Sequence, residues 1–495
     1  MSLKKIGLLI NLSLFCILFA NAQTISGKII STEKEAIPYA TIQIGETYGV
    51  ISNDEGEFSI NTKGFPKNKT VKISCLGFEN LLIPLNKFLS QNYTLKEHVA
   101  ELSEVYISRK KLTVAQILQK VKENKNDNYS VNTENEIFYR STTLDTPKKL
   151  EFEIVKASEL KKKTIKAFNT EFENLRILAE NKTSSNYKDI LLNYSIFNDS
   201  TKIKVQKGTN LINESLDKST DKLSEKFISI IGKQLDSSAT YKVKTGLFKI
   251  IDSLEVGSTF SQNKKDTLSS SLSLKNTITN VINKHDITED SYFSFIFNYE
   301  KNNYILEGIT SFNEEPVYKI TFTPKRKSEK FEGVIYVNTS DFAVVKIDYK
   351  LGKNRFGQRV NLKALVGIKF VENKIQGTVL FKKGSNGFYN LQYIKNEKQQ
   401  YAYFSRPFKF IKNKVDKNDN KTIFKFKFKV ETVSNTIQEL YVVQNTTNTN
   451  ETFTAFKNKD NYKLIKIQSY NPELWDNYNI IAPVDAIKNY HLEKK

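Results

Sequence analysis

The strict alternation of aromatic and charged residues is the feature that most constrains how this chain folds. The clearest example is the run of Phe424, Phe426, Phe428 and Val430 in alternation with Lys425, Lys427, Lys429 and Glu431. Successive side chains of a β-strand point to opposite faces of its sheet. The pattern therefore predicts a strand with one apolar face and one basic face.

Similar rows recur through residues 286–445, which we predict to form one antiparallel β-meander. The other predicted strands follow the apolar rows of residues 293–299, 345–351 and 360–370, with turns at Glu372-Asn373 and Ser385-Asn386-Gly387. The apolar face could curl round helices or a ligand as a half-barrel, or face lipid as a small outer-membrane β-barrel. Short hairpins, a single Trp475 and the charged end at 491–495 favour the half-barrel.

The flanking regions are less regular. Residues 109–157 are predicted to form a linker helix and the first sheet strands, with Thr113 as N-cap of a helix over 114–124. Residues 158–285 are expected to be a helical and irregular insertion, with helices over 160–181 and 215–234. Residues 446–495 are treated as a C-terminal extension.

The N-terminal part, residues 24–108, predicts a small β-sandwich. Its short apolar segments are 24–30, 39–44, 57–60, 71–76, 91–96 and 105–108. Glycine, proline, asparagine and aspartate separate these segments at regular spacing, as turns between short strands require. Together with the meander, this makes the expected fold mainly β, with inserted helices.

The turn at Asn53-Asp54-Glu55-Gly56 must reverse the chain, and Gly56 supplies the positive φ that such a reversal needs. Phe58 is then expected to point into the core. Asp54 and Glu55 lack the twelve-residue ligand spacing of a calcium loop, so we interpret the segment as a solvated turn.

The residues of this part resemble the carboxypeptidase regulatory-like domain. The residues that carry the resemblance, which we assign structural roles, are Gly27, Pro38, Ala40, Gly49, Asn53, Gly56, Phe58, Gly77 and Phe78. The resemblance implies a transthyretin-like, seven-stranded β-sandwich that acts as an accessory module without peptidase activity. Asn53 stands where the family usually has aspartate. The segment 102–107 and the helix after it resemble those of uncharacterised envelope proteins of Gram-negative bacteria.

A weaker resemblance covers residues 318–324, 331–337 and 342–347. These segments are similar to periplasmic lipoprotein carriers and related half-barrels, which hold an acyl chain between a curved sheet and helices. The resemblance implies that the aromatic sheet face could form an apolar pocket. The alternative is that the same rings simply pack a protein core.

The N-terminus predicts export. Lys4 and Lys5 precede an apolar run and an Ala20-Asn21-Ala22 site, the pattern of a secretory signal peptide over residues 1–22. We therefore expect a periplasmic or outer-membrane-associated protein, with Cys75 as the only cysteine left after cleavage. The net charge of +21 is spread along the whole chain, without a nucleic-acid-binding motif.

The sequence predicts no reactive centre. The histidines are His98, His285 and His491, and His98 with Glu101 has the H-x-x-E spacing of zinc carboxypeptidases. No nucleophile elbow and no phosphate-binding glycine loop is present. We therefore expect no catalytic residue, no cofactor and no bound metal.

These observations favour a non-enzymatic cell-envelope protein. In this interpretation the β-sandwich is an accessory module and the sheet binds an apolar ligand or a protein partner. The expected partners are lipid or other envelope proteins, and neither nucleic acid nor a transmembrane helix is expected. The alternatives are a zinc-dependent peptidase or glycan hydrolase, and the small outer-membrane barrel.

Overall fold

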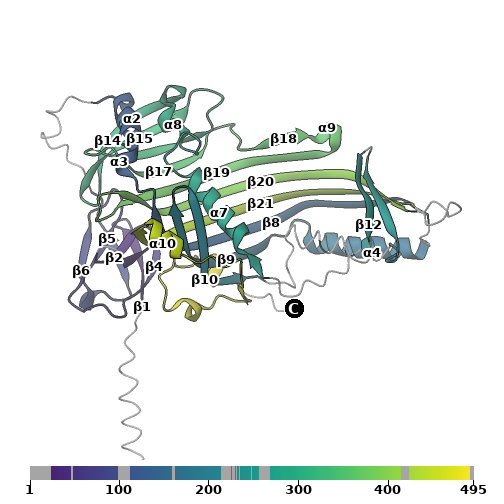
Figure 1. Ribbon diagram of the computed structural model, residues 1–495, viewed down its shortest axis with the longest axis horizontal. Coiled ribbons are helices and arrows are strands. Elements are labelled where there is room, and N and C mark those ends of the chain that lie inside the picture. Colours follow the sequence, from purple (N-terminus) through teal and green to yellow (C-terminus); the bar gives the residue numbers. More distant parts are fainter. Residues whose placement is uncertain are drawn as a thin grey trace, which may run out of the picture. The chain divides into compact units, whose positions relative to one another are not determined.

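The chain folds mainly into β-strands, as its alternation predicts (Figure 1). The computed structural model describes residues 24–45, 48–98, 112–158, 162–212, 225, 229, 231–232, 235–246, 248–255, 268–413 and 423–490. The chain divides into two compact units. The first combines Met1–Arg109 with Ile309–Val317 and Tyr470–Tyr490, and the second holds the remaining residues. The predicted signal peptide, the segment 102–107, Glu101 and His491 lie outside the described residues.

The first unit contains the predicted β-sandwich. Its strands are β1 (Thr24–Ser31), β2 (Thr41–Ile44), β3 (Tyr48–Ile51), β4 (Glu57–Asn61), β5 (Thr70–Ser74), β6 (Leu81–Pro84) and β7 (Asn92–Leu95), with the 3₁₀ turn η1 (Leu85–Lys87) between β6 and β7. One sheet has the order β4-β1-β7 and the other β3-β2-β5-β6. Ile29 and Phe58 of the first sheet and Ile42 and Ile73 of the second belong to one buried cluster. The seven strands agree with the fold that the family resemblance implies.

A distant part of the chain completes this unit. Residues Tyr470–Tyr490 belong to the same unit as the β-sandwich and contain the short helices η4 (Pro472–Trp475) and α11 (Asp485–Lys488). Trp475, Ile481 and Ile487 of this segment are at most 4% exposed. The prediction of a separate extension over 446–495 is therefore wrong for its C-terminal half, because apolar side chains there are buried within the first unit.

The second unit is built on one large sheet, of which residues 309–317 are assigned to the first unit. Its strands are β8 (Thr133–Ala157), β9 (Ser184–Phe197), β10 (Ser200–Leu211), β11 (Thr240–Thr245), β12 (Phe248–Glu255), β14 (Asn302–Phe312), β15 (Glu315–Pro324), β16 (Phe331–Asn338), β17 (Val344–Leu351), β18 (Arg359–Leu362), β19 (Ile368–Lys383), β20 (Tyr389–Lys412), β21 (Ile423–Thr447) and β23 (Ile465–Ile467). The order is β14-β15-β16-β17-β19-β20-β21-β8-β9-β10-β23, with β11 beside β20, β12 beside β11 and β18 beside β19. From β16 to β10 each neighbouring pair in this order is antiparallel, and β10 pairs with β23 in parallel. A separate two-stranded sheet pairs β13 (Ser269–Ser270) with β22 (Asn461–Tyr462).

Short helices accompany the sheet. They are α2 (Val114–Glu123), α3 (Lys125–Asn128), α4 (Lys162–Ala179), α7 (Ser271–Lys284), α8 (Ser294–Phe297), η3 (Tyr299–Lys301), α9 (Lys363–Val366) and α10 (Asn450–Ala455). Thr113 caps α2 as predicted, and Gln116 completes a capping box. None of the described helices is long and apolar enough to cross a membrane.

The strongest periodicities are confirmed. The alternating run at 424–430 lies in β21, where Phe424 and Phe426 are buried while Lys427 is exposed. The apolar row 345–351 is β17. The turn at 385–387 joins β19 to β20, with Gly387 at a φ of +84°. In these segments a single face is buried, so the two-residue period is visible in the sequence.

The predicted strand over residues 293–299 is instead the helical turn α8 followed by η3. Phe293, Phe295 and the next residue, Ile296, are all buried, at 0%, 2% and 0% exposure. A half-buried strand cannot bury adjacent side chains on one face, whereas a helical turn can. Phe295 stacks on Phe322 of β15, with ring centroids 3.9 Å apart.

The predicted single strand over residues 360–370 is broken into β18, α9 and the start of β19. Gly367 adopts a φ of +67°, and an added Cβ there would lie 2.0 Å from the Ser405 carbonyl oxygen. The chain therefore reverses at Gly367, and β18 pairs with β19. The predicted turn at Glu372-Asn373 lies inside β19.

Residues 158–285 are not mainly helical and irregular, because strands β9 to β12 lie there. The predicted helix over 160–181 is α4, whereas 215–234 lies largely outside the described residues. β9 buries Ile190, Leu191 and Leu192 in succession. A strand buried on both faces has no alternation, which explains why the sequence pattern missed it.

A buried ion pair joins β8 to β9. Arg140, 1% exposed, donates two hydrogen bonds of 2.8 Å to the carboxylate of Asp189, its cross-strand partner. The register places Glu439 of β21 on the other side of Arg140. Acids thus flank the buried guanidinium on both neighbouring strands. Such pairs are costly to break because the remaining charge stays buried.

We expect Asp189→Ala to destabilise the second unit by about 3–5 kcal/mol, because Arg140 would stay buried without its bidentate acceptor. Urea unfolding followed by circular dichroism measures the change as a lower midpoint. Glu151→Ala is the matched control, since it removes an exposed partner of Lys149 and should cost less than about 1 kcal/mol. Equal midpoints for the two variants would contradict the stabilising role given to the Arg140–Asp189 pair.

Candidate functional site

The residues that carry the family resemblance occupy tight positions of the sandwich. A Cβ at Gly27 would lie 2.1 Å from the Gln91 carbonyl oxygen, and one at Gly49 would lie 2.5 Å from that of Ile42. Ala40 and Phe58 are buried, and Phe78 packs against the same core. Pro38 is exposed, and Gly77 has a φ of +82°. The structural roles of the set stay a prediction, which these positions make specific.

The turn between β3 and β4 is organised by Asn53. Its side-chain Oδ1 accepts hydrogen bonds from the backbone N–H groups of Glu55 and Glu57, at 2.9 and 2.8 Å. Gly56 closes the turn with a φ of +76° and donates its N–H to the Asn53 carbonyl at 3.0 Å. This is the local side-chain-to-backbone pairing that asparagine and aspartate favour in turns.

The same turn binds the chain's own C-terminal segment. Asn53 Nδ2 lies 3.3 Å from the Ala482 carbonyl oxygen and 3.2 Å from that of Pro483, and it can donate to both. Asn61 Nδ2 donates to the Asp476 carbonyl at 2.8 Å. Asn53 is only 1% exposed. The turn is therefore only partly solvated as expected: Asp54 is exposed, whereas Asn53 is buried by its contacts with the segment Tyr470–Tyr490.

The side-chain amide explains why this chain has asparagine where its family usually has aspartate. A carboxylate at position 53 would still accept from Glu55 and Glu57, but it has no hydrogen to donate. It would instead face the carbonyl oxygens of Ala482 and Pro483 at hydrogen-bond distance. Asn53 thus makes the turn complementary to an extended backbone that presents acceptors.

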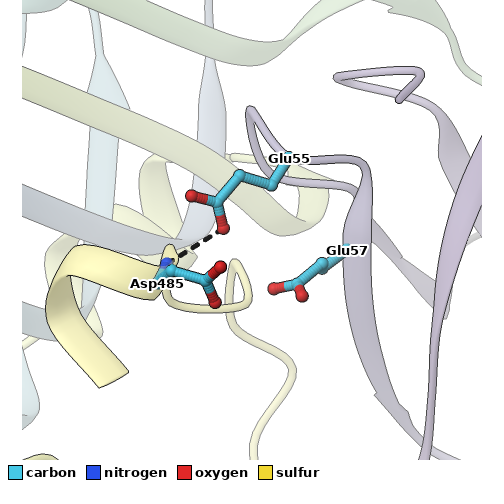
Figure 2. Close-up of side chains that lie close together, drawn as sticks. All are labelled: Glu55, Glu57 and Asp485. Atoms are coloured by element: carbon cyan, nitrogen blue, oxygen red, sulfur yellow. Dashed lines mark hydrogen bonds between the residues drawn. The ribbon is translucent and has the colours of Figure 1, made fainter. Parts of the chain in front are cut away.

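Three carboxylates converge beside this contact, as Figure 2 shows. Oxygens of Glu55, Glu57 and Asp485 all lie within 4.8 Å of one another, and Glu55 also accepts the Asp485 backbone N–H at 2.9 Å. The ammonium of Lys488 donates to Glu57 and to Asp485. Burial disfavours its charge, but these two hydrogen bonds outweigh burial and raise the pKa of Lys488. The chain therefore pairs two of these three carboxylates with its own cation.

The aromatic face of the large sheet is a second candidate, and it is covered by α4. Phe168 and Phe172 of this helix lie 4.7 and 5.1 Å from the ring of Phe152 on β8. Phe424 and Phe426 of β21 belong to the same buried cluster. In this part of the sheet the aromatic rows pack a filled core, which was one of the two alternatives for them.

His285, at the end of α7, lies in a buried polar chain. Its Nδ1 lies 2.6 Å from the Val281 carbonyl oxygen, so Nδ1 carries the hydrogen and Nε2 accepts from the Tyr349 hydroxyl at 2.5 Å. The same hydroxyl lies 3.2 Å from Asn396 Oδ1. Burial lowers the pKa of His285 to about 3; the Val281 contact opposes this shift, and the charges of two nearby lysines add to it. The imidazole is thus a neutral part of the core.

The described residues of the zinc alternative have different local surroundings, and Glu101 lies outside the described residues. His98 is exposed and donates its backbone N–H to the Gly77 carbonyl, whereas His285 is buried in the second unit. Sequence reasoning missed the group around Lys488, because nothing in the sequence links residues 53–57 to residues 476–488. An asparagine in place of the usual aspartate was the one available signal.

We expect Asn53→Asp to loosen the C-terminal segment without unfolding the sandwich. The change replaces two donated hydrogen bonds by repulsion between oxygens, at a cost of about 1–3 kcal/mol. Hydrogen exchange read by mass spectrometry should show backbone amides of residues 476–488 exchanging about 5- to 150-fold faster. Asn86→Asp, at an exposed position of the same unit, adds the same charge and should leave this rate unchanged. An unaltered rate in Asn53→Asp would remove the role given to the amide.

We expect stability to fall with acid through His285. Its pKa is lower in the folded chain than the usual 6.5, so the unfolded state binds the proton first and stability is lost as pH falls from about 6.5 toward about 3. Denaturant midpoints measured between pH 6.5 and 5 should reveal a slope approaching about 1.4 kcal/mol per pH unit. The slope should shrink in His285→Gln and persist in His98→Gln. If the denaturant midpoint of the wild-type protein does not change between pH 6.5 and 5, the effect assigned to His285 is refuted.

Comparisons with known proteins agree with the N-terminal part of this description. Residues 25–107 match the family model of the CarboxypepD_reg-like domain. A putative outer membrane lipoprotein-sorting protein domain from Vibrio parahaemolyticus is similar at 8% identity, over 67% of this chain and 92% of that chain, with a TM-score of 0.20. The Pseudomonas aeruginosa MucA/MucB complex is similar at 6% identity, over 68% and 99%, with a TM-score of 0.16.

The first of these structures belongs to the class that residues 318–347 resemble, but TM-scores this low establish no shared arrangement. The comparison with curated proteins found no match. The family match therefore describes the N-terminal module of the chain. Residues 25–107 form a CarboxypepD_reg-like domain, as the sequence pattern predicted.

Proposed function

We propose that this chain is a non-catalytic, exported cell-envelope protein that binds an apolar ligand or a protein partner. The CarboxypepD_reg-like domain fits an envelope protein without catalysis and would serve for assembly or recognition. The large sheet would provide the binding surface. The predicted signal peptide supports a location in the periplasm or at the outer membrane.

The observation on which the proposal rests is the interface between α4 and the aromatic face of the sheet. Phe168, Phe172, Leu175 and Ala179 follow one another at helical spacing and are at most 7% exposed. They contact rings on strands that come from both ends of the second unit's sequence. One amphipathic helix therefore covers a large apolar surface. An apolar ligand would bind by displacing part of α4 from this surface.

The polar clusters of the described residues support a role other than catalysis. Asp189 is paired with Arg140, Glu57 with Lys488, and His285 with Tyr349. A general base or nucleophile needs an open acceptor or donor in reach of substrate. These groups instead direct their hydrogen bonds to one another.

Native mass spectrometry and organic extraction of the full exported chain test the proposal. We expect a co-purified lipid, and we expect Phe172→Ala to increase binding of a fluorescent long-chain fatty acid several-fold, because the smaller side chain opens space under α4. Ile305→Ala, at a 61% exposed position, is the control and should not change binding. If neither wild type nor Phe172→Ala binds the probe and extracts contain no lipid, the ligand part of the proposal fails.

Metal analysis separates this proposal from the zinc-peptidase alternative. We expect far less than one zinc per chain in the purified protein. His98→Ala should leave that content unchanged, because this side chain is exposed. Stoichiometric zinc that is lost in His98→Ala, together with peptide cleavage, would establish the alternative instead.

A further inference from the structure

Exposed apolar side chains lie on β18, α9 and β12, which Figure 1 places along the same half of the long strands of the second unit. We call this set the apolar tip. Its members and their exposures are Val360 (45%), Leu362 (44%), Leu365 (82%), Phe248 (61%), Ile250 (51%) and Ile251 (37%). Apolar residues grouped on a surface mark interaction sites more often than scattered ones do.

Arg406 of β20 holds the two halves of the tip together. Its guanidinium donates to the Val366 carbonyl at 2.7 Å, and to the hydroxyl and carbonyl oxygens of Thr245 at 2.8 and 3.1 Å. It also lies over the Phe248 ring, 5.8 Å from the centroid. The α9 turn and the β11–β12 turn are therefore fixed to the same strand.

The backbone reinforces this arrangement. Ser405 donates its N–H to the Gly367 carbonyl at 2.8 Å, and Gly246 donates to the Pro407 carbonyl at 3.3 Å. Both turns are thus hydrogen-bonded to consecutive residues of one central strand. The exposure of Leu365 and Phe248 is built into the fold, because the backbone beside each of them is anchored.

Basic side chains surround the tip. Arg359 and Lys363 lie on β18 and α9, and Lys244 and Lys249 lie on β11 and β12. Lys249 is paired with Asp252 at 2.7 Å, while Lys363 lies over the Tyr403 ring. Long cationic side chains beside aliphatic ones suit a lipid interface, where the stems enter the apolar boundary and the charges reach phosphates.

We propose that the apolar tip docks on the surface of a membrane that contains anionic phospholipids. The whole chain has 75 Lys and Arg residues against 54 Asp and Glu residues, which favours approach to a negative surface. A headgroup boundary accepts separate projecting side chains without a complementary hollow, so it fits this surface better than a folded protein partner does. The proposal does not depend on a ligand under α4, because it concerns exposed side chains and not the buried cluster that α4 covers.

Sedimentation of the full chain with vesicles tests the proposal. Wild type should bind vesicles of phosphatidylcholine mixed with phosphatidylglycerol, bind pure phosphatidylcholine less, and lose binding as salt is raised. Phe248→Ser/Leu365→Ser should bind about tenfold more weakly. Leu272→Ser/Ile305→Ser removes two side chains of 61% exposure elsewhere in the unit and should bind within about twofold of wild type. Circular dichroism shows whether each variant is folded.

A fluorescent reporter makes the test independent of those variants. Trp475 is the only tryptophan and is 4% exposed, so Leu365→Trp adds the sole exposed indole. Its emission should shift to shorter wavelength on addition of anionic vesicles, whereas that of Ile305→Trp should not. Absence of vesicle binding by wild type, equal binding by the tip variant, or an unshifted Leu365→Trp spectrum would overturn the proposal.

Discussion

The pairing of β8 with β21 is the interaction on which the second unit depends. Each strand has 25 residues, and the ladder runs from Thr133 opposite Thr447 to Ala157 opposite Phe424. Nearly three hundred residues separate the partners, so the cost in chain entropy is met only when the side chains on both faces also pack.

The side chains that pack on this sheet differ in character along the strands. Toward one end α4 closes an aromatic core, and toward the other end the polar chain of His285, Tyr349 and Asn396 crosses under α7. Gly377 leaves room for that chain, since a Cβ there would lie 2.6 Å from the Tyr349 hydroxyl oxygen. The aromatic core and the polar chain thus use different residues of β20, Phe410 for the core and Asn396 for the chain.

Much of the β-structure was predictable, for a reason visible in particular residues. The rows at Phe424 and Val345 alternate because one face of each strand is apolar, and the turn at Gly387 needs a positive φ. The predictions at 293–299 and 360–370 failed where the alternation was accidental. Burial of adjacent side chains around Ile296, and a backbone reversal at Gly367 imposed by contact with another strand, have no local signature.

The sequence predicted the residues of the candidate site but not the contacts between distant segments that form it. The sequence by itself determined the β-sandwich, its tight glycines and the asparagine turn, because these depend on φ angles and on neighbours a few residues away. Only the tertiary structure decided that residues 476–488 cover that turn, that Lys488 neutralises Glu57, and that α4 fills the aromatic face. Those contacts join segments hundreds of residues apart, and burial and hydrogen bonding between such segments follow from packing in three dimensions, which no local pattern encodes.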